Sequence, residues 1–123
     1  MMLSLGIMQG RLLPSFLGRY QAHPVGIWHE EFYIARDLGF DHIECIVDLN
    51  HLSCNPLISL DGIARLEQAM QKTGTRVYSA CLDVFMELRF TDITTMEISK
   101  ELLKLIIKNG KKVGIGTFVL PFV

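Results

Sequence analysis

The feature that most constrains this chain is a regular alternation between short strand-like runs and longer segments with helical periodicity. Strand-like runs occupy residues 3–8, 42–47 and 75–81, and a last one begins near residue 114. Between them lie three segments with apolar side chains three and four positions apart, namely residues 28–38, 60–73 and 95–113. Short apolar runs favour buried strands, and a spacing of three and four favours helices. The alternation therefore predicts an α/β fold, a parallel β-sheet built from βαβ units.

The ends of the predicted helices depend on capping residues. A glycine follows each of the first two helices, where the left-handed turn that closes a helix favours this residue. Ser59 is a candidate N-cap of the second helix, and the pattern from Thr94 to Glu97 predicts a capping box on the third. Gly110 costs a helix interior roughly 1 kcal/mol relative to alanine, so the third helix ends either there or at residue 113.

The two kinds of connection differ in length. Each helix-to-strand turn is short, whereas strand-to-helix connections are longer and more polar, and residues 9–27 form the longest. In parallel α/β folds, sites lie at the carboxyl ends of strands, in these longer connections. An open doubly wound sheet and part of a (β/α)₈ barrel both fit. Neither a glycine-rich dinucleotide motif nor a P-loop pattern occurs, which disfavours doubly wound folds that bind nucleotides.

Composition limits the partners and the compartment. The net charge is −1 and no basic block of five residues occurs, so neither nucleic acid nor an anionic membrane has electrostatic support as a partner. The three cysteines, Cys45, Cys54 and Cys81, form no C-x-x-C pair, which predicts neither a disulfide framework nor a thiolate zinc site. With no signal peptide and no apolar run of about 18 residues, we expect a cytoplasmic protein.

Polar side chains follow or interrupt the predicted strands. Gln9 and Arg11 follow the first strand, Glu44 lies inside the second, and Asp83 follows the third. A guanidinium can bind hydroxyl or phosphate oxygens. A carboxylate inside an apolar strand is costly unless it is paired or faces a polar cavity, so Glu44 is the strongest candidate for a substrate contact or an acid/base group.

Each candidate has a plainer alternative. Arg11 at a strand end can simply face water, and Glu44 can lie on a solvated side of its strand. Asp83 can be an ordinary turn residue, because Asp is common in turns that follow strands. His42 falls on the same strand face as Glu44, but the four histidines make no metal-ligand pattern. Cys81 has no evident base beside it and is expected to be a small core residue.

Five segments together resemble a known family. They are GIMQGRLLP (6–14), QAHPVGIWHEEFYIARDLGFDHIECIVD (21–48), NPL (55–57), SACLDVFME (79–87) and LPFV (120–123). These segments resemble the N-terminal half of sugar-phosphate isomerases and epimerases. That family belongs to the xylose-isomerase-like (β/α)₈ TIM barrels, which also include endonuclease IV. His23, Cys45 and Val84 stand where the family pattern has Phe, Trp and Tyr, and we expect these departures to alter the pocket lining.

The resemblance implies a fold and an activity. Residues 1–123 would be a single partial domain, half of a TIM barrel with four strands and three helices, since a whole barrel takes about 250 residues. It implies proton transfer next to the carbonyl of a sugar or sugar phosphate, assisted by a divalent ion such as Mn²⁺, Mg²⁺ or Zn²⁺. In such relatives most catalytic and metal-binding groups come from the second half. Gln9, Arg11, Glu44 and Asp83 therefore carry over only as substrate-facing residues, with no metal ligand assigned.

Three functional hypotheses follow. The first is an isomerase-type enzyme that needs a second half or a second chain, and the second is a non-catalytic remnant or half-barrel binding module. The third is a flavodoxin-like domain, which would place the first strand inside the sheet. Unpaired edges at the first and fourth strands, together with an apolar inner face, predict a homo-oligomer.

Overall fold

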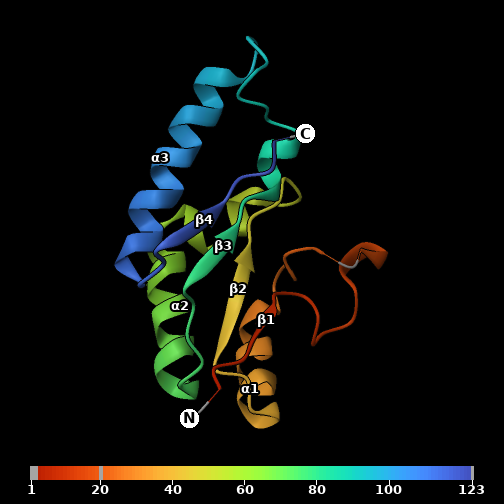
Figure 1. The fold of residues 1–123 in the computed structure, drawn as a ribbon, viewed down its shortest axis with the longest axis vertical. Helices are drawn as coiled ribbons and strands as arrows, with labels where there is room; N and C mark the ends of the chain where they lie inside the picture. Colours follow the sequence, from red (N-terminus) through yellow and green to blue (C-terminus); the bar gives the residue numbers. More distant parts are fainter. Residues whose placement is uncertain (1–2, 20, 123) are drawn as a thin grey trace.

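The computed structural model describes residues 3–19 and 21–122 and shows one parallel sheet with three helices (Figure 1). The strands lie in the order β1, β2, β3, β4, and their bounds are Gly6–Met8, His42–Ile46, Ser79–Cys81 and Thr117–Val119. The helices that join them are α1 (Trp28–Leu38), α2 (Leu60–Thr73) and α3 (Met96–Lys112). The predicted α/β class is confirmed, and the arrangement is consistent with half of a TIM barrel.

The strand order decides between the two architectures that fitted the sequence. A flavodoxin-like sheet needs its first strand inside, whereas β1 lies at an edge of the described sheet. That alternative is therefore wrong. When neighbouring parallel strands follow in chain order, right-handed crossovers return every helix to the same side of the sheet. In agreement, α1 packs against α2 and α2 packs against α3.

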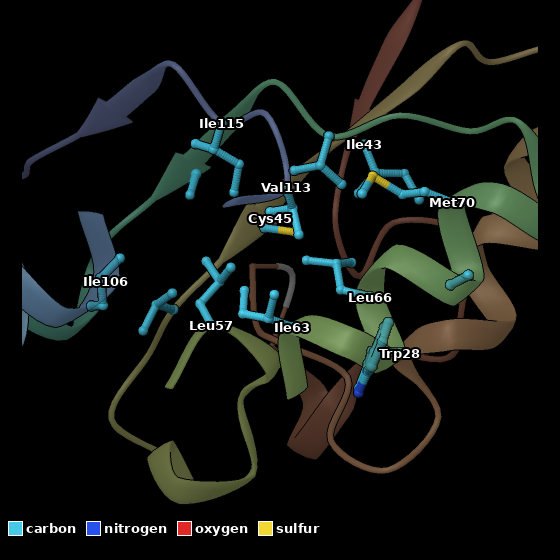
Figure 2. Packing of buried hydrophobic residues seen from close by; sticks show 14 of the residues in the cluster. Trp28, Ile43, Cys45, Leu57, Ile63, Leu66, Met70, Ile106, Val113 and Ile115 are labelled. Carbon is cyan, nitrogen blue, oxygen red and sulfur yellow. The ribbon is translucent and has the colours of Figure 1, made fainter. Parts of the chain in front are cut away.

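The hydrophobic core lies between the sheet and this layer of helices (Figure 2). Successive strand residues point to opposite faces, so Ile43 and Cys45 of β2 both enter the core. They meet Leu66 of α2, while Ile106 of α3 closes the far end of the cluster. Complete burial of such an aliphatic side chain stabilises the fold by about 1.5–3 kcal/mol.

The strands are shorter than the sequence predicted. The first begins at Gly6 rather than at residue 3, and the last spans only Thr117–Val119; Val123, at the end of that predicted strand, lies outside the described residues. The third is interrupted by an extra residue. β2 advances three positions from His42 to Cys45, while its partner advances four from Arg76 to Ala80. This β-bulge removes the first residues of the predicted strand from regular pairing.

The predicted caps of α2 are confirmed, whereas the predicted capping box at the start of α3 is not. The Ser59 hydroxyl accepts the backbone N–H of Gly62 at 3.0 Å. The predicted capping box is wrong, because α3 begins at Met96 and the Thr94 hydroxyl donates instead to Asp92 Oδ1 at 2.7 Å. The short local bond to Asp92 takes the hydroxyl away from the helix end.

The third helix continues through Gly110 to Lys112. A Cβ atom at Gly110 would lie 2.8 Å from the ring of Phe118 in β4. The glycine therefore lets this aromatic ring pack directly on the helix, which compensates for its low helix propensity. In the described part of the chain, no helix is both long enough and apolar enough to cross a membrane.

Candidate functional site

The long connection between β1 and α1 reaches the carboxyl ends of the next two strands. In this connection, Gln21 Nε2 donates to Asp83 Oδ2 at 2.7 Å, and the backbone N–H of His23 donates to Asp48 Oδ2 at 3.0 Å. Asp48 follows β2 and Asp83 follows β3. The connection that follows β1 thus contacts the groups that follow β2 and β3. All of them lie at the end of the sheet where parallel α/β proteins place their sites.

Three buried polar residues form a cluster at this end, the Gln9–His23–Asp48 cluster. Gln9 Oε1 accepts the backbone N–H of Ile46 at 2.9 Å and lies 3.0 Å from His23 Nδ1. The bond to Ile46 fixes the orientation of the amide, and an amide oxygen only accepts. His23 therefore holds its proton on Nδ1 and a lone pair on Nε2. Burial lowers the pKa of His23 to about 4, so the ring is neutral at neutral pH.

Each member of the cluster leaves one hydrogen-bonding atom unsatisfied. Gln9, His23 and Asp48 are 3% exposed or less. Among the described residues, Gln9 Nε2, His23 Nε2 and Asp48 Oδ1 find no partner. An unpaired buried polar atom costs about 1–3 kcal/mol. The three atoms supply one donor group and two acceptors, and a hydroxyl group, which both donates and accepts, complements such a set.

Glu31 of α1 anchors the start of the long connection. Its carboxylate accepts the backbone N–H of Gly10 at 2.8 Å and that of Leu12 at 3.0 Å, and the residue is fully buried. Burial raises the pKa of Glu31, and the two backbone hydrogen bonds partly oppose this shift. Gly10 has a φ of 89°, and a Cβ there would lie 2.6 Å from the Ala22 carbonyl oxygen. The turn thus needs glycine and is held in place by the helix.

Glu44 lies on the inner face, the side of the sheet opposite the helices. Its Oε2 accepts the hydroxyl of Ser79 at 2.6 Å, and both residues are half-buried. Thr117 of β4 is the register partner of Ser79 and continues this polar row across the sheet. The prediction of an apolar inner face is therefore wrong for this part of the sheet. Among the described residues, no hydrogen bond joins Glu44 to Gln9 or to Asp83.

Asp83 and Cys81 form a second buried pair near the rim. Cys81 Sγ donates to Asp83 Oδ1 at 3.2 Å. Burial, followed by the contact with Asp83, raises the pKa of the Cys81 thiol to about 12, so the thiol stays protonated. Cys81 is a small buried residue, as predicted, but the expectation that no base lies beside it is wrong. Its register partner is Ile46, on the inner face, and a carboxylate contacts its sulfur.

The remaining sequence candidates separate into exposed and buried residues. Arg11 is exposed, and within the described residues its side chain makes no hydrogen bond or ion pair. Of the three departures from the family pattern, only His23 lies at the rim. Cys45 and Val84 are buried in the core on the helix side. The expectation that these two residues alter a pocket lining is therefore wrong.

Three residues of the site were not predicted from the sequence, namely Gln21, Glu31 and Ser79. For Glu31 a signal was present, because it lies three residues after Trp28 and four before Ala35 on the apolar stripe of α1. A carboxylate at that position is carried into the interior. For Gln21 and Ser79 no local signal exists, since their partners lie 62 and 35 residues away.

The divalent ion implied by the family resemblance has no matching ligand set in the described chain. No group of three His, Cys, Asp or Glu side chains in residues 3–19 and 21–122 could hold a metal ion. His42 packs instead against Tyr78, with ring centroids 5.3 Å apart. The described side chains therefore do not fit a divalent ion.

Comparison with known proteins assigns no family. No protein-family model and no curated protein matches this sequence. The similarity to sugar-phosphate isomerases and epimerases is therefore a prediction from the motifs alone.

Proposed function

We propose that the carboxyl-end rim of this sheet binds a sugar or sugar phosphate, as part of a protein of the isomerase/epimerase type. The observation that supports this most is the Gln9–His23–Asp48 cluster. Its three side chains are held by each other and by the backbone, yet each keeps one unsatisfied polar atom. A preorganised mixture of donors and acceptors is what a polyhydroxylated ligand requires.

The other candidates have separate roles in this proposal. Glu44 on the inner face accepts a hydroxyl group of the ligand, as it accepts that of Ser79 in the structure. Arg11 is exposed at the start of the same long connection and binds the phosphate. Asp83 is already engaged by Gln21 and Cys81, so it positions the connection rather than contacting the ligand.

Calorimetric titration of ketose phosphates tests the proposal. D-ribulose 5-phosphate and D-fructose 6-phosphate should bind saturably. Glu44→Gln and Arg11→Gln should each weaken binding at least tenfold, and only Arg11→Gln should reduce the preference for the phosphorylated over the free sugar. Glu97→Gln on the exposed side of α3 removes one carboxylate elsewhere and serves as the control. Absence of saturable binding, or equal binding by Glu44→Gln and the control, would contradict the proposal.

A non-catalytic binding module is the second candidate. It is favoured by the described residues, which supply no set of metal ligands. The two candidates differ in turnover. Exchange of the carbon-bound proton next to the carbonyl, followed by NMR in deuterated water with added Mg²⁺, exceeds that of a protein-free sample only in an enzyme. Binding without exchange supports the module, whereas metal-dependent exchange supports the isomerase or epimerase.

We also propose that the protein forms a homo-oligomer and is located in the cytoplasm. β1 and β4 are the two edges of the described sheet, and α3 exposes Ile98 and Leu105 beside Leu102. We expect a homo-oligomer through these surfaces, and sedimentation velocity should show a mass above that of one chain. The three cysteines are free, which supports a cytoplasmic location.

A further inference from the structure

A groove on the outer, helical side of the molecule has the chemistry of an anion site. It lies between α1 and α2, far from the polar row on the inner face, and has a volume of about 240 Å³. Its lining includes Trp28, His29 and Tyr33 of α1 and Arg65, Gln68 and Lys72 of α2.

The charged side chains of this groove are of one sign. Arg65 and Lys72 line it, and no carboxylate does. Within the described residues, neither of the two forms an ion pair. The acidic residue Glu67 lies in an adjoining depression beside Arg65 but outside the groove. A concave surface with uncompensated positive charge concentrates small anions.

Arg65 is positioned without using its hydrogen-bonding capacity. Its guanidinium carbon lies 5.7 Å from the centroid of the Trp28 ring, within cation–π range, and Trp28 is only 2% exposed. The rigid indole therefore holds the guanidinium at the groove. Its planar set of N–H donors stays available to bind two oxygens of a phosphate together.

His29 adds a half-buried imidazole ring to the groove. It lines the groove, and its Nδ1 is buried without a hydrogen-bond partner among the described residues. Buried polar atoms are rarely left unpaired, since this costs about 1–3 kcal/mol. The neutral polar groups of Tyr33 and Gln68 complete the lining.

From these observations we propose that the groove between α1 and α2 binds a small phosphate-bearing anion. Arg65 makes the principal contact. Lys72 lies seven residues further along α2, roughly 10 Å along the helix axis at 1.5 Å per residue, so it reaches the far end of a longer ligand. The site is separate from the proposed sugar-binding rim, and either proposal can fail without the other.

The intrinsic fluorescence of Trp28 tests this site directly, because it is the only tryptophan of the chain. Inorganic phosphate and inorganic tripolyphosphate are titrated at constant ionic strength, with chloride as the reference. We expect a saturable change for both, with tighter binding of tripolyphosphate. Arg65→Gln should weaken both at least tenfold, and Lys72→Gln should weaken tripolyphosphate more than phosphate.

Two controls make the result decisive. Lys108→Gln removes one exposed positive charge on α3, outside the groove, and should bind like the unaltered protein. Arg11→Gln should also leave the fluorescence titration unchanged, and because Arg11 is the residue proposed to bind phosphate at the rim, this result separates the two sites. Because Arg65→Gln alters the starting fluorescence of Trp28, affinities rather than amplitudes are compared. A response no larger than that to chloride, or unchanged affinity in Arg65→Gln, would overturn the proposal.

Discussion

The two faces of this sheet differ in what their side chains do, although they alternate residue by residue along the same strands. On the helix side, Ile43 and Cys45 are 2% exposed or less and belong to a continuous apolar core. On the inner face, Glu44 lies between them and is half-buried, with a hydroxyl group as its partner. One strand therefore contributes both to the stability of the fold and to a polar surface.

A sheet of this kind can separate the residues that stabilise the fold from those that bind a ligand. Removal of an apolar side chain from the helix side creates a cavity, because the interior is closely packed. Removal of a polar side chain from the inner face mainly exchanges a hydrogen bond to protein for one to water. The rim combines both properties, since the Gln9–His23–Asp48 cluster is polar and also buried.

Leu66→Ala tests the helix side. Leu66 is fully buried between α2 and the sheet, so the variant should lower the free energy of unfolding by about 3–4 kcal/mol through lost burial and a residual cavity. Urea denaturation followed by circular dichroism measures this change. Leu60→Ala is the matched control on the same helix, because Leu60 is 65% exposed and should cost about 0.5 kcal/mol or less. Equal losses in the two variants would refute the packing argument.

The buried histidine of the rim predicts a dependence of stability on pH. The pKa of His23 falls from 6.5 in the unfolded chain to about 4 in the folded protein because of burial. The folded state thus binds fewer protons between these values. The contribution of neutral His23 to the free energy of unfolding is fully present above pH 6.5 and is lost as the pH falls toward 4. The total loss is on the order of 3 kcal/mol.

His23→Asn isolates this effect. An asparagine amide can still donate toward Gln9 but does not titrate. The difference in free energy of unfolding between the two proteins, measured from pH 7.5 to pH 4, should shrink as the pH falls. Other acidic groups are present in both proteins and largely cancel in the comparison. Parallel pH profiles would show that His23 is not buried as a neutral ring in solution.

Much of the fold could be predicted from local patterns, but the strand ends could not. The helices and the parallel direction of the strands followed from apolar periodicity and from the alternation of strands and helices, but these patterns left the strand order open between two architectures. The bulge between Arg76 and Ala80 depends on how β3 pairs with β2, which no pattern within the segment encodes. The hydroxyl of Thr94 had two possible partners, and the nearby Asp92 replaced the helix end.

The candidate site, like the fold, has features that local sequence predicts and features that depend on tertiary contacts. Gln9 and Asp83 were predictable as rim residues because polar groups at the ends of parallel strands meet at one edge of the sheet. That Gln9 would instead be closed in by His23, 14 residues later, depends on the path of a long connection. Position in a strand thus predicts where a side chain lies. Only the tertiary contacts show whether its hydrogen-bonding groups are free.

The two buried cysteines on opposite faces allow one substitution to be compared in both environments. Cys45 lies in the apolar core, where a serine hydroxyl would be buried among carbon atoms, and Cys45→Ser should cost about 1–3 kcal/mol. Cys81 contacts Asp83 Oδ1, which would accept the hydroxyl of a serine, so Cys81→Ser should cost about 1 kcal/mol or less. Equal losses by urea denaturation would contradict the assignment of the two residues to different faces.

Ser79→Ala should have the smallest effect, and it also tests whether the inner face is open in solution. The variant removes the hydroxyl that donates to Glu44, and both residues are half-buried. Water can replace that donor, so the free energy of unfolding should fall by about 0.5–1 kcal/mol. Thr117→Ala, on the exposed end of the same row, is the control and should change it by about 0.5 kcal/mol or less.

Concentration dependence separates an open face from a covered one. If a second copy of the chain covered the inner face, water could not reach Glu44, and the carboxylate would lose its donor in a buried environment. The cost of Ser79→Ala would then rise to about 2–3 kcal/mol at high protein concentration and fall on dilution. A small cost at every concentration would place any self-association at the sheet edges and α3, leaving the polar row free to bind a ligand.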